Sequence, residues 1–152
     1  MTRGELAAAN FTSGYNCAQS VLLAFGDMTG LEKATAARLS SGFGGGIGRL
    51  REICGAASGA FMVISLLYGD GGIATHEQKS ELYTRIQDFA ARFKAHNGSY
   101  LCRELLTGVT ADRSPIPEQR TAEYYRKRPC VEIVRDTAEL LEQYIAEHPI
   151  TK

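Results

Sequence analysis

The stretch GFGGGIGRLREICGAASGAF, residues 42–61, constrains the fold of this chain more than any other. It contains seven glycines and one cysteine in twenty residues. Glycine adopts positive φ as readily as negative φ and loses more chain entropy on ordering than any other residue, so such a run disfavours a continuous helix or strand. The pattern predicts a sharply turning loop that ends at Cys54, where a helix begins.

Glycine loops often bind phosphate, but this one matches neither of the standard patterns. A G-x-G-x-x-G fingerprint that starts at Gly42 would need its last glycine at Ile47, and no strand pattern precedes it. A P-loop needs a lysine followed by Ser or Thr after its last glycine, and neither is present. An anion or small-molecule site stays open as an interpretation, as does the close approach of a cofactor. The glycines assigned to such a site are Gly44, Gly45, Gly46, Gly55 and Gly59.

The rest of the chain has the apolar periodicity of helices and no sustained alternation of apolar and polar residues. We therefore predict an all-α protein, a compact bundle of about six helices in a single domain over residues 1–152. Residues 108–117 are expected to form a loop. The expected helices run from Ser13 to Ala24, over residues 31–39, 54–68, 75–97 and 100–106, and from Pro129 to Pro149, with a further helical segment at 118–126.

Two of these helices carry additional signals. Thr75 with Gln78 has the pattern of a capping box, and the pair Asn97-Gly98 is typical of a helix end. In the helix over 54–68, Gly55 and Gly59 lie on one face, where small residues allow a second helix to pack closely. A homodimer contact through this face is the alternative.

Charge and hydropathy exclude several classes of function. Lys plus Arg and Asp plus Glu both total 17, which is not the basic excess of a nucleic-acid-binding protein. The longest apolar stretch, residues 56–68, is shorter than the about 20 residues that cross a bilayer, and the first residues lack the pattern of a secretory leader. We expect a cytoplasmic protein without membrane insertion. Structural disulfides are rare in that compartment, so cysteines there indicate metal or redox chemistry.

Four cysteines lie far apart in the sequence without a C-x-x-C pair, yet each is near a predicted helix start: Cys17, Cys54, Cys102 and Cys130. Free backbone N–H groups and the helix dipole stabilise a thiolate there and lower its pKa. Thiolates are both nucleophiles and metal ligands, so the placement favours redox exchange or metal binding. The alternative is that these cysteines are small buried hydrophobic residues. The basic run 126–128, beside the last cysteine, is interpreted as solvated surface.

At its cysteines the chain resembles a family of redox-active proteins named for a C-GCAxxG-C-C signature. The central element is CGAASG, residues 54–59, with Cys17 in GYNCAQSVL before it and Cys102 and Cys130 after it. The resemblance covers about residues 14–130 and implies a redox role for the four cysteines. Split-Soret cytochromes look related to this family and carry an iron–sulfur cluster with haem. The resemblance therefore implies a cluster held by four thiolates, whereas covalent haem is not implied because C-x-x-C-H is absent.

We therefore expect a redox-active protein whose four cysteines converge in one site and act on an unknown redox partner. Two chemistries fit. One is a dithiol–disulfide couple with Cys54 as the nucleophile, because its glycine-flanked helix start leaves room for a partner. The other is an iron–sulfur cluster or another metal centre with all four cysteines as ligands. The competing hypothesis is a non-catalytic helical binding or dimerisation module, in which the cysteines would lie far apart.

Overall fold

The computed structural model describes residues 1–106 and 112–151, and its regular elements are helices. Within these residues the backbone pairing outside helices amounts to one isolated antiparallel bridge, between Ile53 and Leu101. The all-α prediction is confirmed. The described helices are α1 (Arg3–Thr12), α2 (Cys17–Leu23), α3 (Gly26–Thr29), α4 (Lys33–Ser40), the 3₁₀-helix η1 (Ser41–Phe43), α5 (Gly55–Tyr68), α6 (His76–Asn97), α7 (Cys102–Leu105), α8 (Ala122–Lys127) and α9 (Cys130–Glu147).

The N-terminal segment differs from the prediction. Residues 3–12 form α1, which the sequence analysis did not predict, and α2 begins at Cys17 instead of after Ser13. Capping explains both differences. Thr2 forms a capping box with Glu5, whereas Ser13 caps the C-terminus of α1. Asn16, with Gln19, caps α2. An N-cap side chain accepts a hydrogen bond from a backbone N–H group that the helix itself leaves unpaired. Because two such caps form, the segment folds into two helices and not one.

The later helices follow the prediction closely. Both α5 and α6 begin within one residue of the expected position, and α6 has the predicted Thr75–Gln78 capping box. It ends at Gly98 with φ of 92°. The helix α7 starts at Cys102 because the bridge at Leu101 keeps the preceding backbone extended. Pro129 precedes α9 and is not its first residue. Part of the predicted loop over 108–117 lies outside the described residues.

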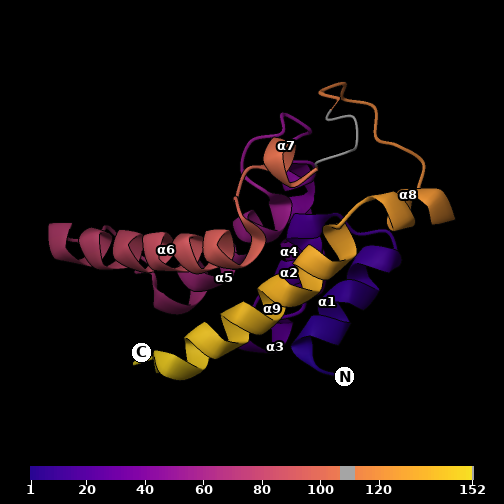
Figure 1. Ribbon diagram of the computed structural model, residues 1–152. Helices are drawn as coiled ribbons and strands as arrows, with labels where there is room; N and C mark the ends of the chain where they lie inside the picture. The colour runs from indigo at the N-terminus through magenta and orange to yellow at the C-terminus, as the bar shows by residue number, and fades with distance from the viewer. Residues whose placement is uncertain (107–111, 152) are drawn as a thin grey trace.

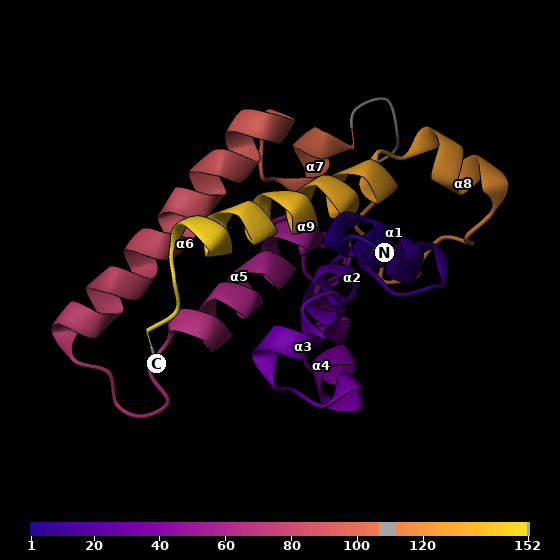
Figure 2. The same cartoon turned by 90° about the horizontal axis from the view of Figure 1, so that it is seen from below.

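The core is built around α5, which contacts α2, α6 and α9, while α9 also lies along α1 (Figures 1 and 2). Most of α5 is buried, as predicted for the apolar stretch. Among the helices of residues 1–106 and 112–151, none combines the length and the hydropathy that a membrane span requires. In both views α7, α8 and the start of α9 lie at one end of the molecule, and this end carries the site.

The small face of α5 packs against α2. A Cβ on Gly59 would lie 2.6 Å from the carbonyl oxygen of Ala18, and one on Gly55 would lie 3.0 Å from Cβ of Cys17. Close packing of a second helix on these glycines is therefore confirmed. The same contact corrects the alternative: α2 of the same chain covers the face that was considered for a homodimer.

Candidate redox site

The site begins with the loop after η1, whose backbone is largely left-handed. Three glycines have positive φ, as predicted: Gly45 (64°), Gly46 (74°) and Gly48 (54°). Three residues with side chains do so as well: Ile47 (69°), Arg49 (65°) and Arg51 (62°). Left-handed backbone costs a residue with a Cβ about 1–2 kcal/mol, so such residues persist only where the surrounding structure imposes them. The backbone of this loop is therefore strained, and the surrounding structure holds it in place.

The glycines of the loop allow it to approach the cysteines. A Cβ on Gly46 would lie 2.7 Å from Cβ of Cys102 and 2.8 Å from Cα of Arg51. A Cβ on Gly44 would lie 2.7 Å from Cβ of Asn16, the N-cap of α2. The loop is therefore packed between the starts of α2 and α7, and no larger residue fits at either glycine without movement.

A short pairing of extended segments brings the second and third cysteines together. The amide of Cys54 donates to the carbonyl of Tyr100 at 2.8 Å, and the amide of Cys102 donates to the carbonyl of Glu52 at 2.7 Å. These bonds flank the bridge between Ile53 and Leu101. Residues 48 positions apart in the sequence are thereby held on neighbouring backbones, and helices α5 and α7 both start at this point.

All four cysteines line one cavity of about 420 Å³. Cys17, Cys102 and Cys130 are the first residues of α2, α7 and α9, and Cys54 is the N-cap of α5, so the predicted placement at helix starts is confirmed. All four are free thiols; Cys54 and Cys102 are buried, and the other two are half-buried. The cavity is also lined by four of the five assigned glycines, Gly44, Gly45, Gly46 and Gly55, whereas Gly59 packs against Ala18.

The thiols of Cys17 and Cys130 form a hydrogen-bonded pair with opposite properties. The hydrogen bond to Cys130 is the main cause that raises the pKa of Cys17 well above its ordinary value of 9.0, and burial adds to it. The same bond lowers the pKa of Cys130; burial opposes this, and the charges of Arg128, Arg120 and Arg51 support it. Of the two thiols, Cys130 is therefore the one that ionises more readily.

The other two cysteines correct the expectation that helix starts lower the pKa of every thiol. Burial raises the pKa of Cys54 to about 12, although the backbone N–H groups of Ala56 and Ala57 act in the opposite direction. Burial also raises the pKa of Cys102, against the hydrogen bond and the charge of Arg51. Desolvation of a thiolate in an apolar site outweighs the partial charge of a helix end. Both thiols are protonated near neutral pH.

Arginines are the part of the site that the sequence analysis missed. Arg49, Arg51, Arg120 and Arg128 line the cavity, together with Glu118. Arg51 is only 2% exposed and Arg128 only 8% exposed. The basic run 126–128 is thus not solvated throughout, because Arg128 pairs with Glu118 and lies over the ring of Tyr124. The left-handed conformation of Arg51 could not be inferred from its sequence neighbours, since arginine rarely adopts it.

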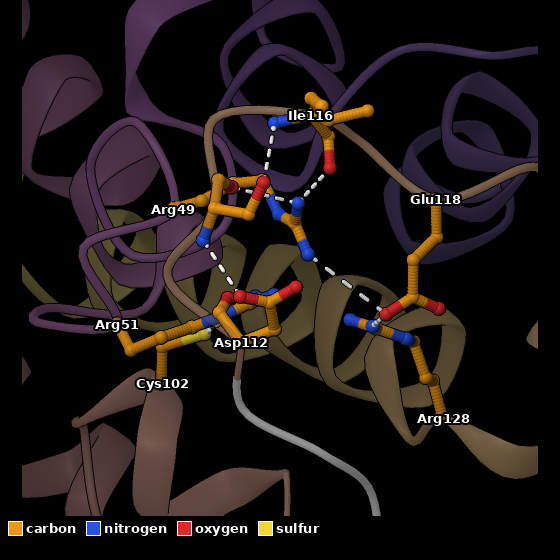
Figure 3. Close-up of polar contacts among 8 residues, drawn as sticks. Arg49, Arg51, Cys102, Asp112, Ile116, Glu118 and Arg128 are labelled. Carbon is orange, nitrogen blue, oxygen red and sulfur yellow. Dashed lines mark hydrogen bonds and ion pairs between the residues drawn. The ribbon is translucent and has the colours of Figure 1, made fainter.

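Figure 3 shows how these arginines hold the segment before α8 against the cavity. Arg49 donates to the carbonyls of Ser114, at 2.8 Å, and of Ile116. Arg51 Nε donates to the carbonyl of Asp112 at 3.0 Å, and Nη1 lies 3.7 Å from Sγ of Cys102. The segment 112–118 is therefore held by Arg49 and Arg51, and its Pro115, Pro117 and Glu118 line the cavity.

The donor set suits a metal centre in kind, since thiolates are the usual ligands of iron–sulfur clusters. In its geometry, however, no group of three or more His, Cys, Asp or Glu side chains is placed to hold a metal ion within residues 1–106 and 112–151. We therefore derive no step through a metal.

An all-α fold that places four thiols and several guanidinium groups around one small cavity has the chemical groups that a cysteine-based redox protein needs. The comparison with protein families agrees: the family described as "Putative redox-active protein (C_GCAxxG_C_C)" matches residues 15–144. The chain belongs to this family, and the resemblance noted at the cysteines is confirmed. No curated protein and no solved structure matches the chain significantly.

Proposed function

We propose that the protein is a thiol–disulfide oxidoreductase in which Cys130 is the attacking thiolate and Cys17 the resolving thiol. The observation that supports this most is that Cys17 and Cys130 line one cavity that a small molecule can occupy, and the interaction between the two thiols shifts their pKa values in opposite directions. Disulfide exchange needs one thiolate and a second thiol within reach of it. Cys130 replaces Cys54 as the nucleophile, because burial keeps Cys54 protonated until about pH 12.

The reaction has two steps. The Cys130 thiolate attacks one sulfur of a substrate disulfide, which forms a mixed disulfide and releases the other half of the substrate as a thiolate. That thiolate takes the proton of Cys17, and the Cys17 sulfur then attacks Sγ of Cys130 and displaces the second half. The second half leaves as a thiolate and takes a proton from water. The substrate thus gains two electrons and one proton from the protein, which is left with a disulfide between Cys17 and Cys130.

The surroundings of the pair favour this order of events. The positive charges of Arg128, Arg120 and Arg51 lower the pKa of Cys130, so that it attacks first. Cys17 keeps its proton in the resting protein, which prevents it from competing for the substrate. Cys54 and Cys102 line the same cavity as protonated thiols and take no part in the two steps.

The first test is the pH dependence of thiol alkylation. The rate of carbamidomethylation of Cys130 by iodoacetamide, followed by peptide mass spectrometry, should rise with a midpoint below pH 9.0, since the thiolate is the reactive form. Cys17→Ala removes the main cause of the low pKa and should raise this midpoint. Cys54→Ala is the matched control and should leave it unchanged. An equal midpoint in all three proteins contradicts the proposal.

The second test identifies the disulfide that forms. One equivalent of oxidised dithiothreitol or of a small linear disulfide should oxidise the reduced protein to a species in which Cys17 is linked to Cys130. Mapping of the linked peptides without reduction would show the pair directly. A disulfide that joins Cys54 to Cys102, or no intramolecular disulfide, would contradict the assignment.

An iron–sulfur cluster held by the four cysteines is the second candidate, and the four thiols on one cavity support it. A bound cluster would supply one-electron transfer. Anaerobic purification followed by iron and sulfide analysis and by visible absorption tests this candidate. Near-stoichiometric iron with charge-transfer bands supports it, whereas colourless, iron-free protein with four titratable thiols supports the dithiol couple.

A further inference from the structure

Arg51 is a buried cation with a free hydrogen-bond donor. Its side chain is almost fully buried, and its Nε and Nη1 atoms face the carbonyl of Asp112 and the sulfur of Cys102. Its Nη2 atom is buried without a hydrogen-bond partner. In the described part of the chain no carboxylate forms an ion pair with it. A buried charge without a counter-charge is strongly unfavourable. An anion bound to this guanidinium would therefore be stabilising.

The cavity as a whole also favours an anionic ligand. Its lining includes four arginines and one glutamate, so its formal charge is plus two when Cys130 is a thiolate, although the whole chain is neutral. The other three guanidinium groups are used within the protein. Arg49 and Arg120 donate to backbone carbonyls, and Arg128 pairs with Glu118. In residues 1–106 and 112–151, therefore, Arg51 is the lining cation with a buried donor, Nη2, that no protein group satisfies.

We propose that this cavity binds the oxyanion group of its substrate on Nη2 of Arg51, and that the substrate is a low-molecular-weight disulfide bearing a carboxylate. The anion subsite depends on Arg51 and the cavity alone, while the disulfide rests on the proposed function. A cavity of about 420 Å³ suits a small molecule and not a folded partner. Guanidinium groups match carboxylate geometry, and hydrogen bonds between charged groups are strong.

The position of Arg51 links the subsite to the reacting thiols. Its Nη1 atom lies 3.7 Å from Sγ of Cys102, so an anion on the same guanidinium would lie near that sulfur. The competing interpretation is that Arg51 serves only to stabilise a thiolate at Cys102. That role would occupy Nη1 and would not distinguish charged from neutral substrates.

The experiment compares two aromatic disulfides as oxidants of the reduced protein: dithiobis(nitrobenzoate), which carries two carboxylates, and uncharged dithiodipyridine. The measured quantity is the ratio of their second-order rate constants at constant ionic strength. Arg51→Gln should lower this ratio about tenfold, the effect of losing one charge-assisted hydrogen bond, and Arg51→Lys should retain most of it. Arg92→Gln is the matched control. Arg92 is an arginine bonded to Glu147 outside the cavity lining, and its loss should leave the ratio unchanged.

Sulfate provides a measurement that needs no variant. As a free inorganic oxyanion it should slow the reaction of the wild-type protein with the carboxylated disulfide more than the reaction with the neutral one, relative to chloride at equal ionic strength. This also tests the subsite if Arg51→Gln fails to fold. An unchanged ratio in folded Arg51→Gln, or equal inhibition of both reactions by sulfate, overturns the inference.

The two proposals fail in different ways. One outcome is that neither disulfide produces a Cys17–Cys130 linkage while sulfate still slows the reaction with the carboxylated disulfide selectively. In that case the proposed function is wrong and the anion subsite is supported. If the linkage forms at rates that are insensitive to substrate charge and to Arg51→Gln, the function stands and the anion subsite falls.

Discussion

The two ends of the molecule are built on different principles. Around Tyr144, where α5, α6 and α9 meet, the rings of Tyr68 and Phe89 pack edge to face at 6.3 and 6.1 Å. The helix α6 is capped at both ends by regular motifs. Around the cysteines the chain instead holds left-handed residues, a buried cation and protonated buried thiols. The first end has the regular packing and capping that stabilise helices. The second end has strained and buried polar groups, which are typical of functional sites.

The largest effect is expected in the helical core. Phe89→Ala removes a fully buried ring and should lower the free energy of unfolding by about 3–5 kcal/mol. Because Phe89 does not line the cavity, the rate ratio of the two aromatic disulfides should stay unchanged in the folded protein. Urea denaturation measures the first quantity and stopped-flow absorbance the second. Tyr83→Ala, on the exposed side of α6, is the control and should change stability by less than about 0.5 kcal/mol.

An intermediate effect is expected at the glycine loop. Gly46 and Gly30 have almost the same φ, 74° and 73°, but only Gly46 has neighbours in the space of a Cβ. Gly30→Ala should therefore cost about 1 kcal/mol, from backbone strain alone. Gly46→Ala should cost about 2 kcal/mol more, because Cys102 and Arg51 must move.

The same pair of variants sharpens the contrast between the two ends. Gly46→Ala should also change the disulfide rate ratio, whereas Gly30→Ala should not, since only the first displaces Arg51. Equal losses of stability in the two variants would mean that the loop relaxes without strain. The distinction between a constrained site and a regular core would then be wrong for this segment.

The smallest effect is expected at the cap of α6. Thr75→Ala removes the side chain that accepts the amide of Gln78 and should lower the free energy of unfolding by about 1 kcal/mol. Thr84→Ala, in the exposed middle of the same helix, should be neutral or slightly stabilising, because alanine is the better helix former. Thermal denaturation of both variants checks this. A larger loss for Thr84→Ala would show that the hydrogen bond from Thr84 to the carbonyl of Ser80 contributes more than the cap at Thr75.

Local patterns predicted most of the helical core. The capping box at Thr75, the helix end at Gly98 and the apolar run of α5 each depend on residues that are close together in the sequence. All three appear in the structure where the sequence predicts them. The segment before Cys17 was mispredicted because Ser13 was assigned to the start of a helix, whereas it ends α1 and Asn16 caps α2. Boundaries between short helices depend on which of several possible caps forms, and a single residue does not decide this.

By itself the sequence determined the helical fold, the family and the position of four cysteines at helix starts, because each depends on residues near one another in the chain. The tertiary structure alone decided which thiol is acidic. Helix starts look alike in sequence. Burial, the partner thiol of Cys17 and the charge of Arg51 come from distant segments, and these differ at each thiol. The burial of Arg51 is a second feature that only the tertiary structure decided. Its burial follows from a left-handed loop closed over α7, and no local pattern indicates that an arginine will adopt that conformation.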